Sequence, residues 1–236
     1  MVKRLFLLII LVSFGAVLFA DDVASFVDEG FSMDGQYYVF GQYGNTEHSQ
    51  GFAEFYTIDI AKNDYVDGGF FIIKPSKTTS GKNGHTLYTD LRKKNAQYIN
   101  DMSLAVIDID NVLYLNSGLK STSEEIIVKD FENSTKKSSE TYSIVLNPWY
   151  SGNTASSKSS FFITVAKKDA NGVQIGKQVI GNPDIKRTGV IGYEIERIIL
   201  SPDRNTFIFV IEKTIATANG NSVRYMVETL EVANFN

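Results

Sequence analysis

Two similar ten-residue segments, one near each end of the sequence, constrain the fold most. Phe31–Phe40 reads FSMDGQYYVF and Leu200–Phe209 reads LSPDRNTFIF, so each has Ser, then Asp two positions later, then an apolar run. Ser and Asp side chains form hydrogen bonds with the backbone of turns, while bulky aromatic and branched residues favour a pleated strand. Each segment therefore predicts a tight turn that leads into a buried β-strand.

Most of the remaining sequence also has the pattern of strands joined by turns. The run 207–211 is apolar at every position, which predicts a central strand buried on both faces. Asn171-Gly172 predicts a hairpin with a type I′ turn. Strands are expected at 36–43, 52–60, 70–73, 104–109, 112–115, 126–131, 142–146, 161–165, 173–180, 190–200, 207–211 and 223–232.

One stretch departs from the strand pattern. Leu91 and Tyr98 fall near helical spacing, and the residues between them include neither Gly nor Pro. Thr89 or Asp90 is a suitable N-cap. The sequence therefore predicts one helix at about 89–102.

The first 20 residues have the layout of a secretory signal peptide. Lys3 and Arg4 are followed by the apolar run Leu5–Phe19 and by Ala20. This run is shorter than the roughly 20 apolar residues that a membrane-spanning helix needs. We therefore expect residues 1–20 to be removed and residues 21–236 to form a single β-rich domain, since no shift in composition marks a further boundary.

Composition limits the compartment and the partners. The sequence has no Cys, so apolar burial rather than a disulfide framework has to stabilise an exported chain, and 16 Phe and 12 Tyr supply the material. The net charge of −4 argues against a nucleic-acid partner, which requires a broad basic face. The expected protein is secreted or periplasmic, with no membrane span after signal removal.

Motifs for catalysis and metal binding are weak. There is no Gly-x-Ser-x-Gly nucleophile elbow, and Ser117–Lys120 and Ser134–Lys137 match Ser-x-x-Lys only within polar turns. The acidic run Asp108–Asn111 does not fit a calcium loop and is typical of a turn. The two histidines, His48 and His85, lie in polar segments without a second ligand at metal-binding spacing. We therefore predict no metal and no cofactor.

An extracytoplasmic hydrolase is an alternative that these motifs leave open. It would use acidic residues or His48, with Glu194 and Glu196, or Glu54 and Asp59, as a carboxylate pair. The positions of such a pair in space do not follow from the sequence. Whether the protein is an enzyme stays open, although a non-enzymatic role is favoured.

Exposed aromatic residues are the main candidates for ligand binding. Trp149, Tyr150 and Tyr43 can stack on a sugar or a peptide, and His48 lies in a neighbouring polar loop, although core packing is the ordinary role of such aromatics. The favoured function is a binding or structural module of the bacterial envelope, with an unknown protein or glycan as partner. A second alternative is a subunit of an envelope or filament assembly, and the oligomeric state stays open.

The repeated segments resemble blades of TolB-type β-propellers. Ser32–Phe40 followed by Phe55–Ile60 is similar to one blade, and Ser201–Ile211 followed by Val223–Val232 is similar to a second. No third copy lies between them, and a helix is expected there. The predicted fold is therefore mainly β and antiparallel, with irregular or partial propeller-like sheets, and a β-sandwich is the alternative.

The sequence also resembles a family of predicted secreted proteins of unknown function found mainly in spirochaetes. The resemblance extends over the whole mature chain and rests on the segment 31–44, on Tyr56–Ile60, on the helix expected in mid-chain, and on the long C-terminal segment 191–229. Met33 stands where that family usually has Pro, and Arg204 where it usually has Gly. The resemblance implies export and a β-rich fold, but no activity and no catalytic residues.

Overall fold

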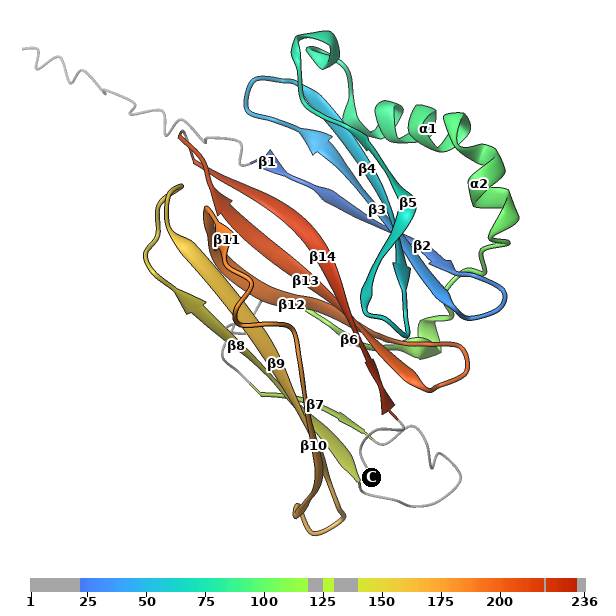
Figure 1. Ribbon diagram of the computed structural model, residues 1–236, viewed down its shortest axis with the longest axis vertical. Helices are drawn as coiled ribbons and strands as arrows, with labels where there is room; N and C mark the ends of the chain where they lie inside the picture. The colour runs from blue at the N-terminus through green and yellow to red at the C-terminus, as the bar shows by residue number, and fades with distance from the viewer. Residues whose placement is uncertain (1–21, 119–124, 130–139, 219, 233–236) are drawn as a thin grey trace, which may run out of the picture.

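The computed structural model describes residues 22–118, 125–129, 140–218 and 220–232. Most of these residues lie in β-strands, which form three sheets stacked face to face, with two α-helices against one outer face (Figure 1). The mainly β fold class is confirmed. The stacked sheets are compatible with both the partial propeller and the sandwich that the sequence predicts.

The N-terminal sheet is a meander whose four strands follow one another in the chain. It consists of β2 (Ser25–Phe31), β3 (Tyr37–Asn45), β4 (Gly51–Asp59) and β5 (Asp64–Ile73). The strands predicted around 36–43 and 52–60 are confirmed, and β5 is longer than predicted because its pairing with β4 resumes beyond a bulge.

The central sheet combines strands from distant parts of the chain. Three long C-terminal strands form its middle, and a two-residue strand from the N-terminal end pairs in parallel with one of them. The order across the sheet is β1 (Asp22–Val23), β14 (Asn221–Glu231), β13 (Thr206–Ala216), β12 (Val190–Leu200) and β6 (Val112–Leu115).

The mid-chain sheet forms the third layer. It is a second antiparallel meander, with one very short strand added beside its third member. Its strands are β7 (Ile126–Lys129), β8 (Thr141–Tyr150), β9 (Lys158–Lys168), β10 (Gln174–Ile180) and the added β11 (Arg187–Thr188).

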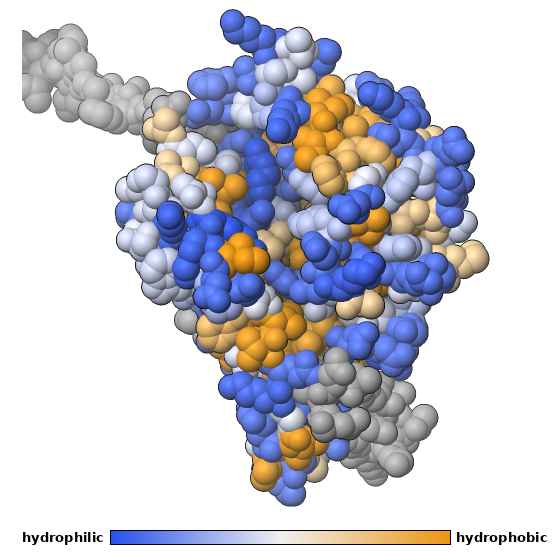
Figure 2. Space-filling view, viewed as in Figure 1, coloured by the Kyte–Doolittle hydropathy of each residue, from blue (hydrophilic) through white to orange (hydrophobic). Residues whose placement is uncertain are grey.

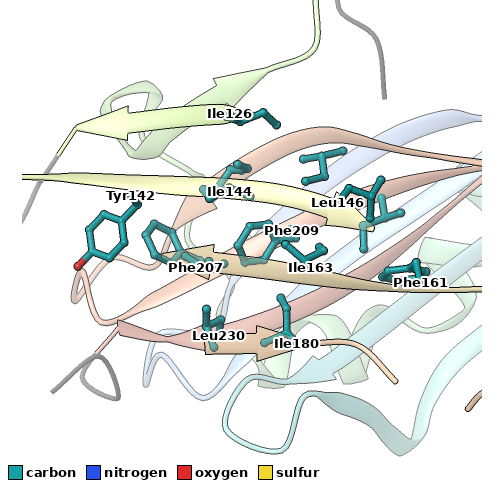
Figure 3. Close-up of a cluster of buried hydrophobic side chains, with 14 of the residues drawn as sticks. Ile126, Tyr142, Ile144, Leu146, Phe161, Ile163, Ile180, Phe207, Phe209 and Leu230 are labelled. Carbon is teal, nitrogen blue, oxygen red and sulfur yellow. The ribbon is translucent and has the colours of Figure 1, made fainter. Parts of the chain in front are cut away.

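The strand β13 links the two hydrophobic cores of the stack. Phe207 and Phe209 point into the cluster between the central and mid-chain sheets, where Figure 3 shows Phe207 beside Tyr142 and Phe209 beside Ile163. Ile208 and Val210, which alternate with them, belong to the cluster between the central and N-terminal sheets. These residues are fully buried, which confirms a central strand buried on both faces.

The helical segment starts earlier than predicted and is divided in two. The structure has α1 (Gly84–Lys94) and α2 (Ala96–Asp101), preceded by the 3-10 turn η1 (Lys77–Thr79). The N-cap is Asn83, not Thr89 or Asp90: its side chain accepts hydrogen bonds from the backbone N–H groups of His85 and Thr86.

Asn95 ends α1, with a φ of −108° and a ψ of 22°. Leu87, Tyr88 and Leu91 of α1 pack on the outer face of the N-terminal sheet, against Val39. No helix in the described residues is long and apolar enough to cross a membrane.

Two local predictions are wrong. The segment 104–109 is not a strand, because Ala105 forms only an isolated bridge with Phe31 and the chain then enters the 3-10 turn η2 (Ile109–Asn111). The β9–β10 hairpin is present, but its turn is not type I′. Within this turn only Gly172 has a positive φ, and type I′ needs two such residues.

The first repeated segment forms the expected turn before β3. Ser32 Oγ donates to Asp34 Oδ1 (2.6 Å) and accepts from the Tyr37 N–H (3.0 Å). Gln36 N–H donates to Asp34 Oδ1 (3.1 Å). Gly35 occupies the left-handed region with a φ of 71°.

The second repeated segment forms the same bonds before β13. Ser201 Oγ donates to Asp203 Oδ1 (2.6 Å) and accepts from the Thr206 N–H (2.9 Å). Asn205 N–H donates to Asp203 Oδ1 (3.2 Å). Arg204 takes the place of the glycine, with a φ of 62°.

Candidate functional site

A cleft of about 550 Å³ lies along the edge of the central sheet. The hairpin between β4 and β5 forms one wall, the end of β10 and the segment after it form the other, and β14 forms the floor. Figure 2 shows hydrophobic surface, in orange, between β10 and β14 below the middle of the view. The apolar part of the lining comes from Ile58, Ile180, Ile185, Met226 and Leu230.

Side chains of the N-terminal sheet close most of the exposed edge of β14. Gln42 Oε1 accepts from the Tyr225 N–H (2.8 Å), and Asn63 Oδ1 accepts from the Thr229 N–H (2.7 Å). Alternate residues of a strand direct their N–H groups to the same side, so Val227 directs its N–H and C=O outward as well. Val227 lines the cleft, and no described residue forms a hydrogen bond with it on that side.

An acidic group lies beside Val227. Glu228 Oε2 accepts a hydrogen bond from Asn63 Nδ2 (2.6 Å). Burial raises the pKa of the Glu228 carboxyl, while the bond from Asn63 and the charge of Arg187 oppose this rise. Tyr65 stands at the rim and is 40% exposed.

Arg187 in the cleft lining and Lys213 beside it form no ion pair with a described residue, although the carboxylates of Asp64, Glu228 and Glu231 also line the cleft. Arg187 lines the cleft, with its guanidinium 5.0 Å from the centre of the Phe161 ring, and its buried Nη1 has no hydrogen-bond partner in the described part of the chain. Lys213 on β13 interacts electrostatically with Arg187 and forms no ion pair with a described residue. Burial, together with the charges of Arg187 and Arg224, lowers the pKa of Lys213 to about 8, although Glu54 opposes the shift.

The nearby charges are already engaged. Arg224 forms a two-pronged ion pair with Asp22 (2.9 and 3.1 Å). Glu54 Oε2 accepts from Gln42 Nε2 (2.7 Å) and from the Tyr56 hydroxyl (2.9 Å). Arg187 and Lys213 therefore differ from these neighbours, because neither forms an ion pair with a described carboxylate, and Glu228 and Glu54 act on them only from a longer distance.

The predicted aromatic residues lie outside this cleft, on two different sheets. Tyr43 of β3 contacts His85 and Tyr88 under α1 (ring centres 5.3 and 5.5 Å apart). Trp149 of β8 is 49% exposed, and the Lys186 ammonium lies 4.2 Å from its ring centre.

The other two predicted site residues are also separate from the cleft. Tyr150 stacks on Tyr193, and its hydroxyl accepts the Tyr193 N–H (2.9 Å). His48 is an exposed residue of the β3–β4 connection, with Nε2 3.4 Å from a Glu47 carboxylate oxygen. The structure does not bring Tyr43, Trp149, Tyr150 and His48 together, and a binding role for each stays a prediction.

The residues of the hydrolase alternative do not converge in the cleft. Glu194 lies directly opposite Glu212 in the β12–β13 register, and Asn116 Nδ2 donates to Glu194 Oε2 (3.1 Å). Burial raises the pKa of Glu196 and of Glu212. Neither these carboxylates nor the histidines line the cleft, and the described residues contain no group of three or more His, Asp or Glu able to hold a metal ion.

Sequence reasoning missed Arg187 and Lys213. Lys213 lies two residues after the apolar run of β13, and a charged residue that continues a buried strand is the signal that points to it. Arg187 lies in a polar connection and has no comparable signal.

A family model described as "Predicted secreted protein (DUF2259)" matches residues 39–231. The chain belongs to this family. The match covers the strands of the cleft and places the protein among secreted proteins of unknown function. No curated protein matches the chain. No solved structure matches it either.

Proposed function

We propose that this secreted protein is a binding module that takes a small ligand in the cleft between the β4–β5 hairpin and β10. The observation that carries the proposal is a cleft of about 550 Å³ whose lining includes the outward backbone of Val227 and a buried Arg187 Nη1 that no described residue accepts from. Small-molecule sites have this size, a largely apolar lining and a few convergent polar groups. The cleft provides an apolar wall, the outward backbone of Val227 and the unpartnered Arg187.

A single-cysteine reporter tests this role, because the chain has no Cys. Ile185 lines the cleft and is 52% exposed, so I185C can carry an environment-sensitive fluorophore. Val106, which is 92% exposed and outside the cleft, gives the matched control V106C. A panel of amino acids, short peptides, sugars and organic acids should include compounds that change the I185C signal saturably and leave V106C unchanged. A panel that changes both reporters alike, or neither, contradicts the proposal.

We also propose that residues 1–20 are removed during export to the bacterial envelope, and that a protein or glycan of the envelope presents the ligand group. The first described strand begins at Asp22, close behind Ala20, which supports cleavage at this junction. N-terminal sequencing of the exported protein should give a start near residue 21. A start at Met1 would contradict this.

A role in assembly is the second candidate, and β5 supports it. β5 is the edge strand of the N-terminal sheet, and Phe70 and Ile72 are 50% and 39% exposed. An exposed apolar edge is a template for pairing with another strand. Antiparallel pairing of two copies places the half with Asp67 against the half with Lys74, so the charges are complementary.

Sedimentation velocity tests the assembly role. The wild-type chain should self-associate with rising concentration, and Phe70→Lys should remain monomeric. Val106→Lys is the matched control, because Val106 is exposed outside the sheets. A wild-type chain that stays monomeric at high concentration eliminates assembly through β5 without affecting the cleft.

A further inference from the structure

We propose that the cleft recognises an oxyanion, a carboxylate or a phosphate group, through Arg187 and Lys213. This inference rests on the proposed binding role of the cleft and adds the chemical class of the ligand. It starts from an imbalance between the two charges and their surroundings. Of the three cations that interact here, Arg224 is neutralised by Asp22, while Arg187 and Lys213 have no carboxylate within ion-pair distance in the described residues.

The arrangement favours an oxyanion over other ligands. An Arg guanidinium offers a planar fork of donors that suits two oxygens of one group, and a Lys ammonium adds a second charge. The Arg187 guanidinium lies over the Phe161 ring, which is a cation–π contact that helps to hold it in place. Arg187 and Lys213 repel each other, and Glu228 and Glu54 offset this repulsion only in part, from beyond ion-pair distance, so a bound counter-charge is favourable. A bound carboxylate or phosphate supplies that charge and the missing acceptor for Nη1.

Strand register places the rest of the ligand. Lys213 lies opposite Arg224 and close to Met226, while Leu230 lies further along β14, opposite Phe207. On the other wall, β11 brings Arg187 opposite Ser159 of β9, and Ile180 pairs four residues further on at Ile163. Arg187 therefore lies at one end of the cleft with Lys213 just beyond the lining, and the apolar lining of Ile180 and Leu230 lies at the other end. The preferred ligand has an anionic head and an apolar body.

Titrations followed by ¹H–¹⁵N NMR test the inference in a Tris chloride buffer at constant ionic strength. Sodium acetate and inorganic phosphate are the two anionic probes, and acetamide is the neutral control. The wild-type chain should show saturable shifts of the Arg187, Lys213 and Val227 amides with at least one anionic probe and none with acetamide. The acetate and phosphate arms identify which oxyanion is preferred. Absence of a saturable response to both probes overturns the inference.

Variants at Lys213 separate recognition from a structural role. Lys213→Met keeps the apolar stem and removes the charge, so it should weaken the response to the anions by about tenfold or more. Lys213→Arg should retain the response. Without ligand, Lys213→Met should unfold at a higher urea concentration than the wild type, because an uncompensated charge has been removed from a partly buried place. An unchanged anion response in Lys213→Met, or a fall in its urea midpoint, contradicts the inference.

The reporter at position 185 distinguishes failure of this inference from failure of the binding role. The comparison uses a neutral compound on two proteins, I185C alone and I185C that also carries Lys213→Met. If the neutral compound binds both proteins saturably and with equal affinity, while acetate and phosphate have no effect, the cleft is a binding site for uncharged ligands. That outcome overturns oxyanion recognition and leaves the binding role in place. A reporter without any response overturns both.

Discussion

The turns at Ser32–Tyr37 and Ser201–Thr206 share one set of hydrogen bonds but lead into strands with different surroundings. β3 follows the first turn and lies between the central sheet and α1, whereas β13 follows the second and lies between two sheets. The position after the Asp is Gly35 in one turn and Arg204 in the other, both at positive φ. The shared Ser and Asp therefore specify the turn locally, while the layers on either side determine how much each strand contributes to stability.

The largest expected effects come from the aromatic residues that end the two segments. Phe40→Ala and Phe209→Ala should each lower the free energy of unfolding by about 3–5 kcal/mol, because both side chains are fully buried and their removal leaves cavities. Urea unfolding measures both. Similar losses would show that Phe40 and Phe209 contribute equally to their separate cores. A loss below about 1.5 kcal/mol at either position would show that they do not.

The serine substitutions should separate the two turns. Ser201→Ala leaves the buried Thr206 N–H without an acceptor and should cost about 2 kcal/mol, whereas Ser32→Ala affects a partly buried bond to Tyr37 and should cost about 1 kcal/mol. The exposed Ser156→Ala is the control and should change stability by less than about 0.5 kcal/mol. If Ser32→Ala lowers the stability more than Ser201→Ala does, the burial of the hydrogen bond does not determine how much each serine contributes.

Exchanging the residues at positive φ should act in opposite directions. Arg204→Gly should raise the free energy of unfolding by about 0.5–1 kcal/mol, because relief of the left-handed backbone outweighs the added entropy of Gly in the unfolded chain. Gly35→Arg should lower it by a similar amount. Thermal unfolding measures both, and a loss of stability in Arg204→Gly would show that contacts of the Arg204 side chain matter more than its backbone.

The smallest effect should appear at low pH. The hydrogen bond from Ser32 lowers the pKa of Asp34, and bonds from Ser201 and Asn205 lower the pKa of Asp203 although burial opposes them. A lowered folded-state pKa stabilises the protein above the unfolded value of about 3.9, and this contribution is lost as the pH falls through the folded pKa. Asp34→Asn and Asp203→Asn should therefore each flatten the fall in stability between about pH 4 and pH 2, and unchanged slopes would contradict this.

Features that depend on neighbouring residues in the sequence could be predicted. The Ser and Asp of each turn form their hydrogen bonds within six residues of sequence. The unbroken apolar run of β13 is by itself enough to predict that the strand is buried. The start of α1 was harder to predict, because Asn83 lies at the end of a polar stretch whose composition is typical of a loop. The type of the β9–β10 turn was predicted wrongly because the Asp169 side chain determines it. This side chain accepts hydrogen bonds from the N–H groups of Asn171 and Val173 and favours a turn with one positive φ.

The cleft could not be predicted, because it depends on long-range pairing. Asn63, Arg187 and Val227 come from three separate segments, and only the stacking of the sheets brings them to one edge. That Arg187 and Lys213 have no described partner is likewise a property of the folded arrangement. The aromatic residues were predicted as ligand contacts from their residue type alone. Tyr150, which stacks on Tyr193, shows that residue type does not distinguish an aromatic that packs within the protein from one that contacts a ligand.

The composition of the central sheet has a consequence for the order of folding. Its middle strands β12, β13 and β14 follow the strands of both flanking sheets in the chain, and β1 has no strand to pair with until β14 has been made. Both flanking sheets would present their apolar inner faces to solvent during that interval. A chain that is threaded across a membrane from its N-terminus therefore closes the stack only after β14 has crossed.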